Sequence, residues 1–267
     1  MERQVASGLA EIEAAPDGTF VLRVDGSLQS QVDLADPANL SFEYMRRIGD
    51  LLDAVAGRRQ PISVLHIGGA GLTLPRYVAT TRPRSRQIVL EPDEDLTEFV
   101  REALPVPKRA GIKVRGATGR AGIADVYDDS VDVLIVDAFV REAVPANLVT
   151  TEFALEALRV LRPGGVAVYN LIDGTAGLPF LRRVAATMLA SFGQGVALAE
   201  RKVFRGKSFG NVILATSRQP LPDVTPAVRK AQPPYDVLPL AEVAGKAQPL
   251  VDADAFTTPA APAGTFR

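Results

Sequence analysis

The sequence predicts an α/β protein, with a doubly wound, mostly parallel sheet preceded by a small N-terminal β-meander. Three observations support this fold class. Strand-like and helix-like segments alternate from residue 61 to about residue 171. The strand-like runs there are continuously apolar, as in parallel sheets that helices cover on both faces. Residues 1–40 instead show short alternating patterns between turn residues, which is typical of hairpins.

Residues 1–55 are predicted to form an N-terminal β-rich domain plus a linking helix. The segments GLAEIEA, TFVLRVDG and SLQSQVDL alternate apolar and polar residues, and the turn residues APDG and DG lie beside them. The pattern then changes to a helical period, with Ser41 as the expected N-cap. The apolar stripe of this helix consists of Tyr44, Ile48, Leu51 and Leu52.

Residues 56–217 are predicted to form the main domain. Its expected parallel strands are, in chain order, ISVLHIG, QIVLEP, IKVRGA, VDVLIVDA and GGVAVYNL. Two later strands, GVALAE and GNVILAT, form a hairpin-like pair. The clearest helical segments are 151–165, which ends in a Pro-Gly-Gly stop, and 178–193. Residues 218–267 are rich in proline and alanine, and we expect a tail with few regular elements.

Composition and charge argue against several classes of protein. The chain has 267 residues, of which 47% are apolar, and a net charge of -1, so we expect no nucleic-acid partner. It has no cysteine and one histidine, which excludes disulfides, zinc ribbons and cysteine nucleophiles, and we expect no metal. No apolar run approaches the roughly 18–20 residues of a membrane span. The polar N-terminal residues do not resemble a signal peptide, so we expect a cytoplasmic protein.

The segment VLHIGGAGLTLPRYV, residues 64–78, predicts a ligand-binding turn. Gly68 and Gly69 follow an apolar strand and precede a helical pattern. Because they lack Cβ atoms, a ligand can approach their backbone and face the amides of the next helix. The spacing departs from G-x-G-x-x-G and therefore does not indicate a dinucleotide. The alternative is a tight turn that binds nothing. His66, inside the strand, is interpreted as a packed core residue.

Two acids follow strands of the predicted sheet. Glu91 ends the second strand about 20 residues after the glycines, where an acid of a doubly wound sheet accepts hydrogen bonds from ribose hydroxyls. The alternative is an ordinary solvated acid, and the acids at 93–95 are interpreted as helix caps. Asp137 ends the fourth strand, at the carboxyl edge where ligands of such sheets bind. Its alternative role is to cap the next loop.

A basic cluster precedes the last expected strand. It consists of Arg201, Lys202, Arg205 and Lys207. Two interpretations stay open at this point. The cluster is either a solvated hairpin loop or a lid that faces an anion or a substrate.

Together these segments resemble the spermidine synthase family, the polyamine aminopropyltransferases. The resemblance covers about residues 20–216, and its most specific segment is LVTTEFALEALRVLRPGG. The late RGKSFGNVILATS is similar to a bacterial branch of spermidine synthase-like proteins. The resemblance implies that residues 56–217 are a nucleoside-binding, Rossmann-like domain of the class I methyltransferase type. It also implies decarboxylated S-adenosylmethionine as co-substrate, an amine acceptor, and dimers or larger homo-oligomers.

The resemblance also implies roles for individual residues. Asp137 matches the family acid that takes the proton from the attacking amine. The acceptor would contact Tyr44, Asp137 and Phe139. The implied donor-binding residues are Gln29, Gly68, Gly69, Ala70, Gly71, Glu91, Pro92, Thr118 and Gly119.

Three positions depart from the family pattern. Gly71, Thr118 and Val140 stand where the family has acids, and two of those acids, at 71 and 140, would grip cationic amines. Polyamine specificity is therefore doubtful, and three hypotheses follow. The chain is an aminopropyltransferase-like enzyme, a methyltransferase that uses intact S-adenosylmethionine with Arg76 near the donor's carboxylate, or a paralogue that binds a nucleoside without turnover.

Overall fold

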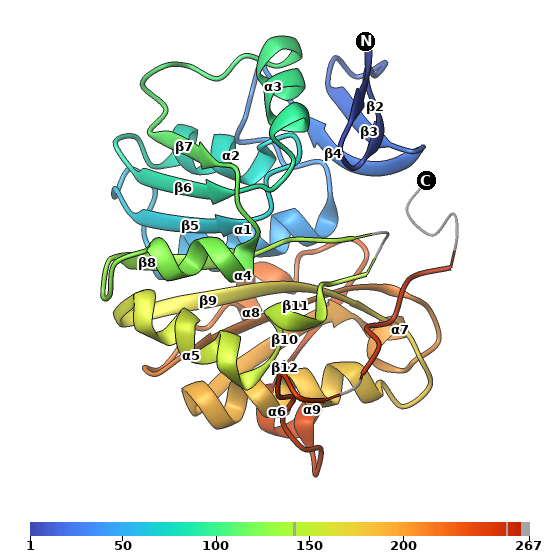
Figure 1. Ribbon diagram of the computed structural model, residues 1–267. Coiled ribbons are helices and arrows are strands. Elements are labelled where there is room, and N and C mark those ends of the chain that lie inside the picture. Colours follow the sequence, from blue (N-terminus) through green and yellow to red (C-terminus); the bar gives the residue numbers. More distant parts are fainter. Residues whose placement is uncertain (141–142, 255, 263–267) are drawn as a thin grey trace.

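The computed structural model describes residues 1–140, 143–254 and 256–262, and in these residues a four-stranded sheet lies beside an eight-stranded sheet (Figure 1). The strand order of the large sheet is β12-β10-β11-β9-β8-β5-β6-β7. Helices cover both faces of the large sheet (Figure 1). The predicted α/β fold class is confirmed, including the mostly parallel sheet and the separate N-terminal sheet.

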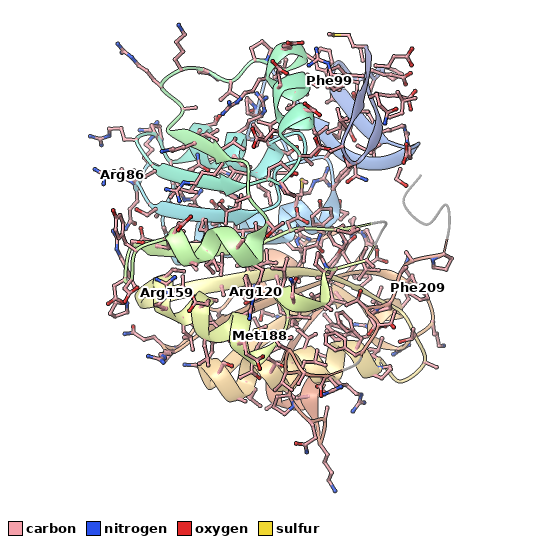
Figure 2. All side chains as sticks on the ribbon, in the orientation of Figure 1. Arg86, Phe99, Arg120, Arg159, Met188 and Phe209 are labelled. Carbon is pink, nitrogen blue, oxygen red and sulfur yellow. The ribbon has the colours of Figure 1, made fainter. Side chains whose placement is uncertain are left out.

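The N-terminal sheet is an antiparallel meander that packs on helix α3. Its strands are β1 (Glu2–Val5), β2 (Gly8–Ala14), β3 (Phe20–Val24) and β4 (Ser27–Val32). Phe99 of α3 (Glu94–Ala103) is buried and lies next to this sheet (Figure 2). The guanidinium of Arg3 lies 5.2 Å from the centre of the Phe99 ring. Apolar packing therefore joins the small sheet to the main domain.

Helix α1 (Glu43–Val55) links the two sheets. It begins after Phe42, which is its N-cap, so the prediction that Ser41 caps this helix is wrong. The apolar stripe of α1 is buried against the large sheet as expected, with Ile48, Leu51 and Leu52 almost inaccessible to solvent.

Five parallel strands form one part of the large sheet, and the glycine turn follows the first of them along the chain. They are β5 (Ser63–Ile67), β6 (Arg86–Leu90), β7 (Ile112–Arg115), β8 (Val131–Val136) and β9 (Leu161–Asp173). Their spatial order is β7-β6-β5-β8-β9, so the direction of winding reverses between β5 and β8. Ligands of open α/β sheets bind outside the carboxyl ends of the strands at such a reversal.

Three antiparallel strands complete the sheet. They are β11 (Gly210–Ser217), β10 (Gln194–Glu200) and β12 (Tyr235–Pro239). The first two form the expected antiparallel pair. Strand β12 comes from the proline-rich segment and pairs with β10, an addition that the sequence did not predict. The domain boundary at residue 217 stays a prediction, and the last residues of that segment lie outside the described part of the chain.

The helices divide between the two faces of the large sheet. The remaining α-helices are α2 (Thr73–Thr81), α4 (Gly119–Gly122), α5 (Thr151–Val160), α6 (Pro179–Phe192), α7 (Arg201–Phe204), α8 (Thr225–Val228) and α9 (Leu240–Ala244), and the 3-10 helices are η1 (Ile123–Asp125) and η2 (Ala146–Leu148). Helices α5, α6 and α9 cover one face, and α1, α2 and α8 cover the other. Among the described residues, no helix is long and apolar enough to cross a membrane.

Candidate active site

The glycine turn between β5 and α2 lies directly against the end of β8. Gly68 has a φ of +95°, and a Cβ atom placed on it would lie 2.2 Å from the carbonyl oxygen of Asp137. The amide of Asp137 in turn donates to the carbonyl of Ile67 at 2.9 Å. Glycine is therefore required at position 68 so that the two strand ends can meet.

Glu91, which directly follows β6, holds the glycine turn from its other side. Its Oε2 accepts hydrogen bonds from the amides of Gly69 and Ala70 at 2.9 and 3.3 Å. Its Oε1 accepts from the amide of Asp93 at 3.1 Å. Asp93 itself accepts from the amide of Leu96 at 2.9 Å and caps α3, which confirms its predicted capping role. Glu91 thus lies at the turn with a carboxylate that is already partly engaged.

The edge strand β4 brings the N-terminal sheet against the same turn. The amide of Gly71 donates to Oγ of Ser30 at 3.0 Å. The hydroxyl of Thr73, in the first turn of α2, donates to the carbonyl of Gln31 at 3.2 Å. These contacts fix the turn between the small sheet and the large one.

Gln29 occupies a special place in β4. Leu22 pairs with Ser30 while Arg23 pairs with Leu28, so Gln29 is the extra residue of a β-bulge. Bulges redirect side chains and are common next to active sites. Gln29 directly precedes Ser30, which contacts the glycine turn, and this neighbourhood suits the donor-binding role that the sequence predicts.

Asp137 is the centre of a side-chain cluster at the carboxyl end of β8. Its Oδ1 accepts from Nδ2 of Asn170 at 2.8 Å, and its Oδ2 accepts from the hydroxyl of Tyr44 at 3.3 Å. Nδ2 of Asn211 donates to Oδ1 of Asn170 at 2.9 Å. Tyr44 comes from α1, Asn170 from β9 and Asn211 from β11.

Burial sets the electrostatics of this cluster. It raises the pKa of Asp137 above the usual range of a carboxyl, and the hydrogen bonds from Asn170 and Tyr44 oppose that rise. Burial and the neighbouring Asp137 raise the pKa of Tyr44 well above that of an ordinary phenol, so Tyr44 acts as a hydrogen-bond donor. Burial and the two hydrogen bonds therefore act on the pKa of Asp137 in opposite directions.

Sequence reasoning missed Asn170 and Asn211. Asn170 is a buried polar residue inside the apolar run of β9, three residues before that strand ends. Asn211 opens β11 after a glycine, and its partner depends on how β11 pairs with β9. The first of these residues could have been found from the sequence, whereas the second needs the fold.

The remaining predicted donor residues line the same edge of the sheet. Thr118 and Gly119 follow β7, where the hydroxyl of Thr118 accepts from the amide of Ala121 at 3.3 Å and caps α4. A Cβ atom on Gly119 would lie 2.1 Å from Cγ2 of Ile67, so this glycine permits close packing against β5. Pro92 is exposed next to Glu91.

The segment after Asp137 supplies apolar residues. Phe139 is partly buried and packs against the core that lies under α5 and α6, whereas Tyr44 packs on the opposite face. Val140 is 65% exposed and forms a bridge with Ala143. An exposed valine therefore stands at the position of the second family acid.

Two other predicted candidates have structural partners. Arg76 is buried, and its guanidinium donates to the carbonyls of Gly71, Pro105 and Leu104 at 3.2, 3.0 and 2.5 Å. Burial lowers the pKa of Arg76 to about 10. Nε2 of His66 lies 2.9 Å from Oε1 of Gln87 inside the sheet, and the interpretation of this histidine as a core residue is confirmed.

The basic cluster follows β10 and is partly neutralised. Arg201 pairs with Asp236 at 3.0 Å, and Lys202 pairs with Glu200 at 2.9 Å. The loop that follows packs on the segment after β9, because a Cβ atom on Gly174 would lie 2.4 Å from Cα of Phe209. These pairs favour a structured surface loop, and a lid function stays a hypothesis.

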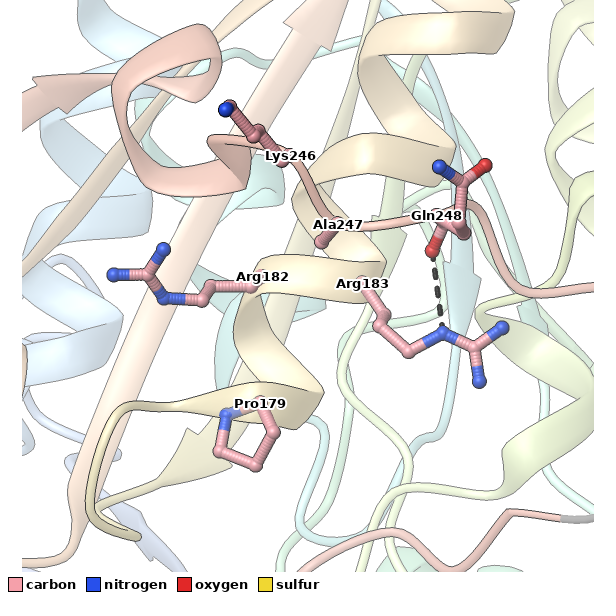
Figure 3. Close-up of a pocket in the computed structure, with 6 residues that line it drawn as sticks. All are labelled: Pro179, Arg182, Arg183, Lys246, Ala247 and Gln248. Carbon is pink, nitrogen blue, oxygen red and sulfur yellow. Dashed lines mark hydrogen bonds between the residues drawn. The ribbon is translucent and has the colours of Figure 1, made fainter.

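A cavity of about 540 Å³ lies elsewhere, between the start of α6 and the segment after α9 (Figure 3). Its cations do not converge, since the guanidiniums of Arg182 and Arg183 point apart (Figure 3). Nε of Arg183 donates to the carbonyl of Gln248 at 3.2 Å (Figure 3). Among the described residues, no three or more acidic or histidine side chains lie together in a group that could hold a metal ion.

Comparison with known proteins identifies relatives by sequence. The chain is 24% identical over 174 residues to a polyamine aminopropyltransferase of Chromobacterium violaceum, covering 64% of this chain and 66% of that protein. It is 31% identical over 137 residues to a probable polyamine aminopropyl transferase of Bifidobacterium longum, covering 51% and 30%. The chain thus matches less than two thirds of the length of each of these relatives. No protein-family model matches it.

Solved structures extend the likeness to nearly the whole chain. A probable spermidine synthase from Corynebacterium glutamicum has a TM-score of 0.88 and 26% identity, covering 97% of this chain and 99% of that one. A spermidine synthase in complex with the transition-state analogue AdoDATO has a TM-score of 0.62 and 20% identity, covering 86% and 78%. Human methyltransferase-like protein 13, with a TM-score of 0.58 and 21% identity over 79% and 96% of the two chains, shares the fold alone. By sequence and by fold, the chain is therefore similar to polyamine aminopropyltransferases and to spermidine synthases.

Proposed function

We propose that this protein transfers the aminopropyl group of decarboxylated S-adenosylmethionine to an amine, with Asp137 as the proton acceptor. The observation that carries the proposal is the Asp137 cluster beside the glycine turn. One carboxylate, supported by Asn170 and Tyr44, faces the strand ends where the fold binds ligands. The structural neighbour in complex with a transition-state analogue supports the same co-substrate.

The residues at the turn fit a nucleoside-bearing donor. A carboxylate has about four acceptor sites, and Glu91 uses three for the amides of Gly69, Ala70 and Asp93. The bond from Ala70 is long, at 3.3 Å, so a ribose hydroxyl can use the free site and a second can replace this contact. Gln29 of β4 and Thr118, which follows β7, are further polar candidates for donor contacts.

The chemistry needs a base because the acceptor arrives as a cation. An alkyl amine has a pKa near ~10, so about one molecule in a thousand is unprotonated at pH 7. The carboxylate of Asp137 binds the ammonium and takes its proton. The amine nitrogen then forms a bond to the aminopropyl carbon while the carbon–sulfur bond breaks and its electrons go to sulfur. The products are the alkylated amine and methylthioadenosine.

The raised pKa of Asp137 serves this proton transfer. Burial brings the carboxyl closer to the amine in pKa than a solvated aspartate would be, which lowers the cost of moving the proton. The two hydrogen-bond donors oppose that rise and favour the ionised form, which is the form that binds the cation. Asp137 thus combines binding with proton acceptance.

The contacts of Arg76 favour aminopropyl transfer over transfer of a methyl group from intact S-adenosylmethionine. That donor carries a carboxylate, for which Arg76 was the cationic candidate near the turn. The guanidinium is instead bonded to three backbone carbonyls. The structure therefore offers the decarboxylated donor a better match than the intact one.

The test begins with calorimetric titration of the protein with each donor separately. We expect the decarboxylated donor to bind at least about tenfold more tightly, equivalent to about 1.4 kcal/mol. Methylthioadenosine release is then measured with a panel of amines for wild type and Asp137→Asn. Asp125→Asn, at an exposed acid on η1, is the matched control. Turnover that Asp137→Asn leaves at the wild-type rate would overturn the assignment of the base.

Binding of the decarboxylated donor without methylthioadenosine release from any amine would support the non-catalytic hypothesis. Tighter binding of the intact donor would support methyl transfer. These outcomes separate the three hypotheses because each predicts a different pair of binding and turnover results.

A further inference from the structure

A row of three polar side chains crosses three neighbouring strands beside the candidate base. Asn211 of β11 donates to Asn170 of β9 at 2.9 Å, and Asn170 donates to Asp137 after β8 at 2.8 Å. We propose that Asn211 is a positioning residue, which fixes the orientation of the Asn170 amide so that Asn170 always presents its donor to Asp137. This inference rests on the proposed function, in which Asp137 is the base.

Strand alternation explains why these side chains meet. Successive residues of a strand face opposite sides of the sheet, so Asp137 continues the face of Ile135, and Asn170 that of Val168. Asn211 likewise continues the face of Ile213, which pairs with Asn170. All three apolar residues belong to the core under α1, the helix that carries Tyr44. Each polar residue therefore extends an apolar stripe to the edge of the sheet where the site lies.

Each asparagine in this row must donate its hydrogen bond toward Asp137. An asparagine amide has one end that donates and one that accepts, whereas an ionised carboxylate only accepts. Asn170 must turn its NH2 group toward Asp137, which points its oxygen away. Asn170 is 1% exposed, and in the described residues the donor that meets its oxygen is Nδ2 of Asn211. Without Asn211, that buried oxygen would lack a protein donor, and the amide would be free to turn over.

The other groups that face Asp137 show why the orientation of the Asn170 amide matters. From α1, the phenol of Tyr44 donates to the other carboxylate oxygen at 3.3 Å. From β5, His66 lies on the same face but is bonded to Gln87, and burial lowers its pKa to about 4, so it is neutral. Asn170 is thus the closer of the two donors that orient the carboxyl of Asp137 and favour its ionised form.

The variant Asn211→Asp tests the row because it reverses the polarity without changing the size. A carboxylate at 211 accepts only, so it draws the NH2 group of Asn170 away from Asp137. We expect kcat for methylthioadenosine release to fall about 10- to 100-fold. The KM for the donor should change by less than about twofold, because the donor contacts lie at the glycine turn. Gln60→Glu, an exposed amide elsewhere, adds the same charge as a control.

A double-variant comparison separates positioning from a general loss of structure. If Asn211 acts through Asn170, the Asn211→Asp change has little further effect on kcat in an Asn170→Ala background. Additive losses in the double variant would overturn the proposal. The conservative Asn211→Gln, which keeps a donor, should retain more activity than Asn211→Asp.

A readout independent of turnover keeps the inference distinct from the proposed function. The 13C shift of the Asp137 carboxyl, assigned with Asp137→Asn, gives its pKa by titration. Loss of the oriented Asn170 donor should raise that pKa in the uncharged variant Asn211→Ala relative to wild type, because the donor stabilises the ionised form and alanine adds no charge beside Asp137. An unchanged titration would refute the positioning role even if the enzyme proves active. A raised pKa in a protein without turnover would support the row while removing the proposed function.

Discussion

The amide of Gly71 donates to the hydroxyl oxygen of Ser30 at 3.0 Å, and this contact leaves no room for a side chain at position 71. A Cβ atom there would lie 2.7 Å from Cβ of Ser30 and 3.1 Å from Cγ2 of Val32. The acid that the related family carries at this place is therefore excluded by the packing of β4. The close packing of the N-terminal sheet on the turn therefore requires glycine at position 71.

Restoring the acid at position 71 should damage the fold and not recover amine binding. We expect Gly71→Asp to lower the free energy of unfolding by about 1–3 kcal/mol, as overpacking of a filled site does. Chemical denaturation measures this change. Gly57→Asp is the control, because a Cβ atom at that exposed glycine meets nothing within 4 Å. Equal stability of the two variants, with better diamine use by Gly71→Asp, would contradict the argument.

Adding an acid at position 140 should change the choice of amine. Val140 is 65% exposed three residues after Asp137, so Val140→Asp costs little packing and can meet a second cation. We expect kcat/KM for butane-1,4-diamine to rise by up to about tenfold relative to butylamine, since an exposed charged contact contributes modestly. Competition between the two amines measures the ratio. Tyr127→Asp, at an 86% exposed side chain on another loop, should leave the ratio unchanged.

The strands were predictable because buried parallel strands read as continuous apolar runs, and β5, β6 and β8 follow that pattern closely. Strand β12 was not predictable, because it lies in a proline-rich segment and lacks a continuous apolar run. Such a segment is tolerated at a sheet edge, where β10 supplies the pairing partner that the local sequence cannot show. Local pattern therefore identifies central strands better than edge strands.

The site residues that directly follow strands could be predicted from the sequence. Asp137 and Glu91 follow apolar runs, and both lie at the carboxyl edge as expected. That Glu91 braces the amides of Gly69 and Ala70 could not be predicted, because it depends on the angle between the turn and β6. The Asn211 contact likewise depends on a register between distant strands.

His66 should make the stability of the protein depend on pH. Burial lowers its pKa to about 4 in the folded state, against 6.5 for an ordinary histidine, and it is the one histidine in the chain. Between these values the unfolded chain binds the proton and the folded chain does not. The neutral histidine therefore costs nothing above pH 6.5, and stability is lost as the pH falls toward 4, by up to roughly 3 kcal/mol.

The variant His66→Gln isolates this effect from the many carboxylates. Denaturation midpoints of wild type and His66→Gln should converge at low pH, because the variant has no imidazole to protonate. The measurement is the difference in free energy of unfolding between pH 7 and pH 5 for the two proteins. The same pH dependence in both would show that His66 does not titrate as its burial requires.

Glu91→Gln should separate the two tasks that the structure gives this residue. The amide keeps one acceptor oxygen, but its NH2 group opposes a backbone N–H, either at Gly69 or at Asp93. We expect unfolding to become easier by about 1 kcal/mol, and affinity for the decarboxylated donor to fall about 10- to 100-fold as a charged hydrogen bond to ribose is lost. Denaturation without ligand measures the first effect and calorimetry the second, with the exposed Glu13→Gln as control. Loss of stability with unchanged affinity for the decarboxylated donor would show that Glu91 stabilises the glycine turn but does not bind the donor.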